Sequence, residues 1–370
     1  MRLPRASKST SICLLALVSA APVLSAPTPV APVAPWPTDG KTLAIIDKYS
    51  YYAAAAYCRK LNDDSVNNLV CVNRTPGYCG QLAGAVTVHQ FHANDSIAGY
   101  VAVSRAEREI IAGFRGTASI SDIFKDLQVR LKDPKKSLAE RAMASQAVGA
   151  VPPLALPGDT DPVLPLCEPC RVHAGFWDAF RGIKDALKET IQEQLRRHPG
   201  YQVKVTGHSL GGAVASIAAG YLRKSGIPAD VYTYGSPRVG DPAFAAFISG
   251  QENGTTTRVT NGHDPVTAVI GIFAGYAHTT PEYWFPKRVE EPKNVNICVG
   301  VQNTSCSGRF FPNVFYVRDH SSVNYAKGFD ACPEQAKESE SLPDFTEADV
   351  EEWKDRGLVD DVDQVNARGL

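Results

Sequence analysis

Residues 205–212 constrain the fold more than any other part of the chain, because they join a strand, a sharp turn and a helix in direct succession. Residues 201–206 alternate and are rich in β-formers, and residues 213–222 carry apolar side chains at helical spacing. Between them lies the only G-x-S-x-G of the sequence, with glycines two residues before and after Ser209. Such a turn predicts that the Ser209 hydroxyl stands beside the helix N-terminus. Ser209 is therefore a candidate nucleophile, and the N–H of Leu210 is a candidate oxyanion donor.

A serine is a weak nucleophile at neutral pH, so Ser209 requires a base. Where a serine occupies such a turn, its partners follow along the chain in the order serine, acid, histidine. The histidines downstream of Ser209 are His263, His278 and His320. His320 follows a β-rich apolar run at 315–317, which predicts a strand with His320 in the loop at its end. His278 is the rival base, and His263 lies beside the better acid.

That acid is Asp264, in a turn that follows a short β-rich segment at 258–260. By itself Asp264 is interpreted as a turn residue before Pro265, and His320 as a surface imidazole. Together with Ser209, however, the two side chains have the order that a catalytic triad requires. The triad is therefore preferred to two unrelated loop residues.

Several separate motifs resemble those of the fungal secreted class 3 lipases, a family of filamentous-fungal triacylglycerol lipases and related feruloyl esterases. The resemblance covers residues 43–332 and rests on FRGT at 114–117, HAGF at 173–176, GHSLG at 207–211, YGSPRVG at 234–240, DPV at 264–266, EYW at 282–284 and DH at 319–320. It implies an α/β-hydrolase fold, in which a mostly parallel central sheet has helices on both faces. It also implies a single domain with a short helical lid.

By this resemblance Ser209 is the nucleophile, Asp264 the orienting acid and His320 the general base of an acyl-enzyme mechanism. No metal ion or organic cofactor is expected for such chemistry. The sequence contains no H-E-x-x-H helix, no P-loop and no dinucleotide-binding G-x-G-x-x-G, which agrees with that expectation. The expected partners are an ester substrate and a lipid–water interface.

The segment after residue 116 is expected to complete the site. By resemblance Thr117 is the second oxyanion residue beside Leu210, and Asp126 supports the Thr117 hydroxyl. The next residues form an apolar stripe at the spacing of a short helix, made of Ile120, Ile123, Phe124 and Leu127. An ordinary surface helix would show the same stripe, but the family places its mobile lid here. Ile123 occupies a position where a lid tryptophan is common, and we expect moderate interfacial activation.

Composition fits one large secreted domain, with 44% hydrophobic and 21% charged residues. The net charge of −1 gives no electrostatic case for a nucleic-acid partner.

Residues 1–26 are interpreted as a signal peptide and residues 27–41 as a proline-rich leader, with no transmembrane anchor. The lipase domain is expected at 42–332, with an insertion at 132–171. Residues 333–370 hold 12 acidic and four basic residues and are expected to be a disordered tail. The protein is expected to be an extracellular monomer.

Cysteine usage agrees with export, because removal of Cys13 with the signal peptide leaves eight of the nine cysteines. Spacing alone leaves their pairing open. The resemblance implies the pairs Cys58–Cys332, Cys71–Cys79 and Cys298–Cys306, which leaves Cys167 and Cys170 for a local bond. Four sequons suggest surface glycosylation, at Asn73, Asn94, Asn253 and Asn303.

The sequence thus predicts a secreted carboxylic-ester hydrolase with triacylglycerols as its main substrate. A feruloyl or other soluble-ester esterase and a phospholipase are the alternatives among enzymes, and a catalytically inactive binding protein is the alternative outside them. His208 and His173 are expected to pack rather than react. The apolar run at 266–273 is either core or part of an acyl-chain groove. Helices are expected at 43–59 and 177–195, and strands at 84–91, 97–104 and 109–114.

Overall fold

One eight-stranded sheet, with its strands in chain order, carries the candidate nucleophile at the end of a central strand. The strands are β1 (Val86–Ala93), β2 (Ile97–Ser104), β3 (Glu109–Phe114), β4 (Gln202–His208), β5 (Ala229–Tyr234), β6 (Thr256–Asn261), β7 (Glu282–Phe285) and β8 (Asn296–Cys298). Strands β3 to β7 are parallel, and β1, β2 and β8 are added antiparallel at the two edges. Parallel strands require crossover connections, which bring the loops after β4, β5 and β6 to one edge of the sheet.

The computed structural model describes residues 39–63, 65–73, 78–93, 97–116, 166–167, 170–268, 270, 275–301, 303–310 and 314–332. Its helices are α1 (Gly40–Ala55), α4 (Ala174–Arg181), α5 (Lys184–Arg197), α6 (Leu210–Lys224), α7 (Pro242–Gly250) and α8 (Ser322–Tyr325). Short 3₁₀ turns are η1 (Arg59–Leu61), η2 (Gly80–Leu82), η3 (Pro265–Thr267), η5 (Ser307–Arg309) and η6 (Val314–His320). Asp39 and Asp241 cap α1 and α7 by accepting backbone N–H bonds from the first turns.

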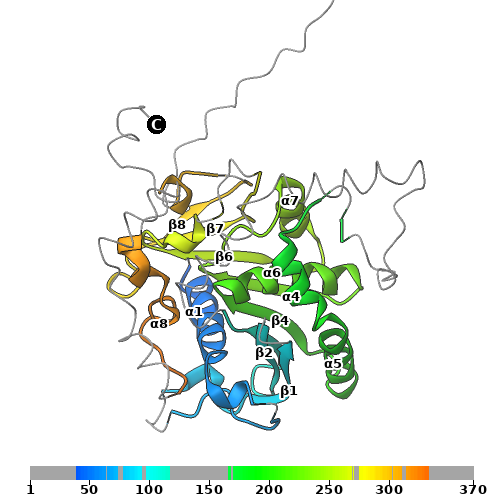
Figure 1. The fold of residues 1–370 in the computed structure, drawn as a ribbon. Helices are drawn as coiled ribbons and strands as arrows, with labels where there is room; N and C mark the ends of the chain where they lie inside the picture. The colour runs from blue at the N-terminus through cyan, green and yellow to red at the C-terminus, as the bar shows by residue number, and fades with distance from the viewer. Residues whose placement is uncertain are drawn as a thin grey trace, which may run out of the picture. The chain divides into compact units, whose positions relative to one another are not determined.

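Helices cover both faces of the sheet (Figure 1). On one face, the apolar sides of α4, α5, α6 and α7 pack on strand residues such as Val205 and Val231. On the other face, α1 and α8 pack on Tyr232 and Tyr234 of β5. Successive strand side chains point to opposite faces, so one buried strand contributes to both cores. The structure therefore confirms the predicted α/β-hydrolase architecture.

Four predicted elements differ from the structure. The strand expected at 84–91 is β1, which begins and ends two residues later. The helix expected at 177–195 is two helices, because Gly182 ends α4 and is a poor helix former. The first helix begins and ends earlier than expected, and η1 begins at its predicted last residue, Arg59. The run at 315–317 lies in η6 and not in a strand. A short apolar run does not distinguish a strand from a buried helical turn, and Val317 is buried in the core.

Several predictions concern residues outside those that the structure describes. They are the signal peptide at 1–26, most of the leader at 27–41, most of the insertion at 132–171, the tail at 333–370, the oxyanion residues Thr117 and Asp126, the lid residues Ile120, Ile123, Phe124 and Leu127, and the sequon Asn94. They stay predictions.

Among the described residues there are four disulfides, in the pairing that the resemblance implies together with the local bond: Cys58–Cys332, Cys71–Cys79, Cys167–Cys170 and Cys298–Cys306. The first joins residues 274 positions apart, whereas the second joins residues only eight apart. A disulfide that closes a longer loop restricts the unfolded chain more strongly.

We expect the paired substitution Cys58→Ser/Cys332→Ser to lower the free energy of unfolding by about 2 to 5 kcal/mol, because the unfolded chain regains its loop entropy. Urea unfolding followed by circular dichroism measures this loss. Cys71→Ser/Cys79→Ser is the matched control and is expected to cost less. An equal loss from both pairs would contradict the loop-length argument.

Candidate active site

Ser209 lies in a strained turn between β4 and α6. Its backbone has φ 60° and ψ −130°, a conformation that L residues rarely adopt. A Cβ on Gly207 would lie 2.2 Å from the carbonyl oxygen of Gly211, and a Cβ on Gly211 would lie 2.2 Å from the carbonyl oxygen of Phe114. Both glycines of the G-x-S-x-G pattern are thus required by close backbone packing. Strain held in this way is typical of functional positions.

Asp264 and His320 form a buried hydrogen-bonded pair. Both carboxylate oxygens of Asp264 lie 2.9 Å from Nδ1 of His320. The carboxylate also accepts the N–H of Val266 at 2.9 Å and the hydroxyl of Tyr325 at 2.7 Å. Because a carboxylate only accepts, Nδ1 of His320 carries a proton, and the tautomer that this bond favours presents the lone pair at Nε2. This is the arrangement that a general base needs.

Gly235 joins the serine turn to the Asp264–His320 pair. The Ser209 N–H donates to the carbonyl of Tyr234 at 2.8 Å, and Gly235 follows directly with φ 57°. A Cβ on Gly235 would lie 2.7 Å from Oδ2 of Asp264 and 3.0 Å from Nδ1 of His320. Ser209 Oγ and His320 Nε2 are both buried and have no hydrogen-bond partner among the described residues. Catalytic hydrogen bonds often tighten only when substrate binds.

His208 packs against the candidate base, as expected of a structural residue. Its Nε2 lies 2.7 Å from the carbonyl oxygen of His320, so Nε2 donates and Nδ1 accepts the hydroxyl of Tyr57 at 2.8 Å. Burial, followed by the nearby imidazole of His320, lowers the pKa of His208 well below its usual range. A neutral His208 therefore holds the backbone of the base in place.

Two features bear on the oxyanion position. Leu210 is the first residue of α6, where backbone N–H groups have no acceptor within the helix. A Cβ on Gly116 would lie 2.8 Å from Cβ of Ser209, so the chain just before Thr117 passes against the nucleophile. The roles of Leu210, Thr117 and Asp126 stay predictions.

The rival histidines have other surroundings. His278 is buried, and its Nε2 bonds to the carbonyl of Thr267 at 2.8 Å. Burial, Arg258 and Arg238 lower the pKa of His278 well below its usual range. The His263 ring packs on Phe310 with centroids 3.9 Å apart.

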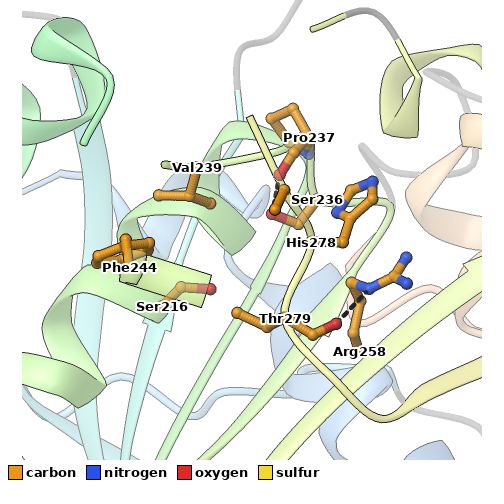
Figure 2. Close-up of a pocket in the computed structure, with 9 residues that line it drawn as sticks. Ser216, Ser236, Pro237, Val239, Phe244, Arg258, His278 and Thr279 are labelled. Atoms are coloured by element: carbon orange, nitrogen blue, oxygen red, sulfur yellow. Dashed lines mark hydrogen bonds between the residues drawn. The ribbon is translucent and has the colours of Figure 1, made fainter. Parts of the chain in front are cut away.

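His278 also lines a small internal cavity of about 10 Å³, beside Ser236, Arg258 and Thr279 (Figure 2). Arg258 Nε donates to the carbonyl of Thr279 at 3.0 Å. Such a volume holds about one water molecule, and not an ester substrate.

A larger cavity, of about 410 Å³, lies beside His263 and Asp319, the residues directly before Asp264 and His320 in the sequence. It is lined by His263, Lys287, Tyr316 and Asp319, among others, and its described lining includes neither Ser209 nor His320. Burial raises the pKa of Asp319 above its usual range. This hollow is therefore separate from the reacting atoms.

Other residues that the sequence singled out are buried in the core. Val266 and Ile270 are fully buried, which favours core over groove for these two residues. His173 is buried at the start of α4, with its ring 4.4 Å from that of Phe176. Among the described residues, potential metal ligands gather only at Glu282, Cys298 and Cys306. These two cysteines form a disulfide, which removes them as ligands.

Sequence reasoning missed Tyr325 and Asn261. The Tyr325 hydroxyl donates to Asp264 and accepts the N–H of Asn261 at 3.0 Å. Burial, followed by the charge of Asp264, raises the pKa of Tyr325 well above its usual range, so it remains a donor. No spacing pattern marks either residue, because their contacts span more than 60 positions.

Comparisons with known proteins show which family this chain resembles. A family model described as lipase (class 3) matches residues 111–273. The secreted mono- and diacylglycerol lipase 1 of Fusarium solani is 32% identical over 272 residues, 70% of this chain and 70% of that protein. The secreted mono- and diacylglycerol lipase A of Penicillium camembertii is 28% identical, over 68% of this chain and 73% of that protein. The solved mono- and diacylglycerol lipase from Aspergillus oryzae is 29% identical with a TM-score of 0.59, over 80% of this chain and 100% of that one.

Proposed function

Since the chain belongs to the class 3 lipase family and is a serine ester hydrolase, we propose that Ser209, His320 and Asp264 are its catalytic triad. The observation that carries this proposal is the buried Asp264–His320 pair, joined through Gly235 to the strained Ser209 turn. Ser209 Oγ and His320 Nε2, which have no hydrogen-bond partner in the described part of the chain, are the two atoms between which the triad mechanism transfers a proton.

In the proposed reaction, Nε2 of His320 takes the Ser209 proton while Oγ attacks the ester carbonyl. The negative oxygen of the tetrahedral intermediate is stabilised by the N–H of Leu210 and by Thr117. His320 then gives its proton to the leaving alcohol, and the acyl group stays on Ser209. A water molecule, deprotonated by His320, then attacks the acyl carbonyl. The bond between that carbon and Ser209 Oγ breaks, His320 returns its proton to Oγ, and the carboxylic acid leaves. Asp264 holds the imidazole orientation and stabilises the imidazolium in both steps.

We propose that the substrates are acylglycerols and that triacylglycerols are the main class. The apolar stripe predicted at 120–127 favours this class because it suits an oil surface. The names of the relatives support a second candidate, mono- and diacylglycerols. Feruloyl esters and phospholipids are the alternative substrates with which the acylglycerols are to be compared.

Two relatives are named as secreted, which supports the proposal that this chain is exported and acts at a lipid–water interface. None of the described helices is both long enough and apolar enough to cross a membrane. Asn253 is exposed in the turn before β6, whereas Nδ2 of Asn303 donates to the carbonyl of Val299 at 2.8 Å. Asn253 is therefore the more accessible sequon of these two.

We expect emulsified long-chain acylglycerols to be hydrolysed faster than a dissolved short-chain ester or methyl ferulate, because the apolar stripe suits an oil surface. Initial rates on tri-, di- and monoacylglycerol emulsions, with Ser209→Ala as the control, measure this preference. A faster rate on the dissolved esters would contradict lipase function and indicate an esterase. Equal negligible rates for both proteins on every ester would contradict the proposed triad.

A further inference from the structure

We propose that Arg288 is a positioning residue for the triad, because its guanidinium holds Tyr325 in the place from which the phenol donates to Asp264. This inference rests on the proposed function of Asp264. It adds to the active site a residue that reaches it only through another side chain.

Arg288 is fully buried in the turn that follows β7. Its Nε donates to the backbone carbonyl of Tyr325, and its Nη2 donates to Oδ1 of Asp47 at 3.0 Å. The guanidinium also lies over the ring of Phe285, 4.4 Å from its centroid. Its orientation is thus fixed by the sheet on one side and by α1 on another.

Asp47 of α1 binds a second cation beside the same tyrosine. Its Oδ2 accepts Nζ of Lys327 at 2.9 Å, while Oδ1 accepts Arg288. Lys327 lies two residues after Tyr325, just beyond the end of α8. The Asp47 carboxylate therefore binds both Arg288, which contacts Tyr325, and Lys327, in the chain that follows Tyr325.

The hydroxyl end of Tyr325 is bound by Asn261, which Arg288 also contacts. The N–H of Asn261 donates to the Tyr325 hydroxyl at 3.0 Å, and Oδ1 of Asn261 accepts the backbone N–H of Arg288 at 3.1 Å. Nδ2 of Asn261 donates to the carbonyl of Asp319, directly before His320, at 3.0 Å. Arg288 thus helps to fix both the main chain and the hydroxyl of Tyr325.

Stability alone does not explain this burial. Nη1 of Arg288 has no hydrogen-bond partner among the described residues, and a buried unpaired donor destabilises the folded state. An apolar side chain of similar volume often replaces a buried ion pair without loss of stability. The geometry is explained by a requirement to hold Tyr325 against Asp264. Without that donor, the carboxylate keeps only the N–H of Val266 and His320 itself as partners among the bonds described above, and its orientation toward His320 is less firmly fixed.

The test is a double-mutant cycle with Arg288→Met and Tyr325→Phe, measured on a dissolved short-chain ester. We expect each single variant to lower kcat by about tenfold, the effect of one hydrogen bond to a charged group, with KM changed by less than about twofold. Because Arg288 acts through the Tyr325 hydroxyl, we expect the double variant to be no slower than Tyr325→Phe alone. Multiplicative losses, or an unchanged kcat in Arg288→Met, would overturn the inference.

Two further variants separate positioning from general destabilisation. Arg288→Lys keeps a donor near Tyr325 and is expected to recover part of the lost kcat. Arg223→Met removes another buried arginine, which donates to the carbonyls of Ala229 and Ile248 at the far end of α6. We expect it to lower the unfolding midpoint and leave kcat unchanged. An equal fall of kcat in Arg223→Met would overturn the inference.

If Arg288→Met does not fold, Asp47→Asn takes its place in the same cycle, with the same expected non-additivity and the same contradicting result. Failure of the proposed function is distinguishable, because it appears as equal rates for wild type and Ser209→Ala. Failure of the Arg288 inference leaves those two proteins far apart.

Discussion

Replacing Ser209 by alanine is expected to lower kcat on a dissolved short-chain ester by about a million-fold, because no acyl-enzyme can form. Alanine keeps the Cβ, so the strained backbone at position 209 is unchanged. The lost hydroxyl is buried without a described partner, and its removal is therefore expected not to lower the free energy of unfolding. Stopped-flow ester hydrolysis and urea unfolding measure the two quantities.

Ser216 provides a matched control on the same helix as the nucleophile turn. It is buried, and its hydroxyl donates to the carbonyl of Gly212 at 3.0 Å. Ser216→Ala is expected to keep kcat within about twofold, because this hydroxyl bonds only to the helix carbonyl four residues earlier, and such bonds contribute little. A Ser209→Ala protein that retains a measurable fraction of wild-type turnover would show that the serine is not the nucleophile.

Asp264→Asn is expected to lower kcat by about 10⁴-fold while the protein remains folded. The asparagine amide would face Nδ1 of His320 and the Tyr325 hydroxyl, which now donate to the carboxylate. An amide donor at Nδ1 favours the tautomer with its proton on Nε2, which cannot accept the Ser209 proton. Steady-state kinetics on the dissolved ester measure the loss.

Asp241→Asn is the control for this change of charge. Asp241 caps α7 by accepting the N–H of Phe244 at 2.9 Å, and asparagine caps a helix about as well. We expect both kcat and the unfolding midpoint of this variant to equal those of wild type. If Asp264→Asn also kept kcat within about tenfold, Asp264 would not be the orienting acid.

The nucleophile turn is predictable from the sequence because its causes are local. Gly207 and Gly211 are required because a Cβ at either position would lie 2.2 Å from a backbone carbonyl oxygen. The flanking strand and helix each show the hydrophobic periodicity of their own type. The order serine, acid, histidine then selects Asp264 and His320 without any knowledge of their distance. These two residues meet in the structure, although η6 carries His320 where a strand was expected.

The supporting contacts are not predictable in the same way. Tyr325 reaches Asp264 across 61 positions, and Arg288 reaches Asp47 across 241. Such contacts depend on how α1 and α8 pack on the sheet, and no local pattern records that packing. The break between α4 and α5 shows the same limit at short range, since a single glycine decides it.

The most direct test of the proposed triad is covalent labelling with a p-nitrophenyl alkylphosphonate. Attack by Ser209 Oγ on phosphorus displaces p-nitrophenolate and leaves a stable phosphonate ester on the serine. We expect one equivalent of p-nitrophenolate to be released, and mass spectrometry of the digested protein to place the adduct on Ser209. We expect Ser209→Ala to form no adduct. A folded wild-type protein that stays unlabelled, or that carries the adduct on another residue, would contradict the assignment.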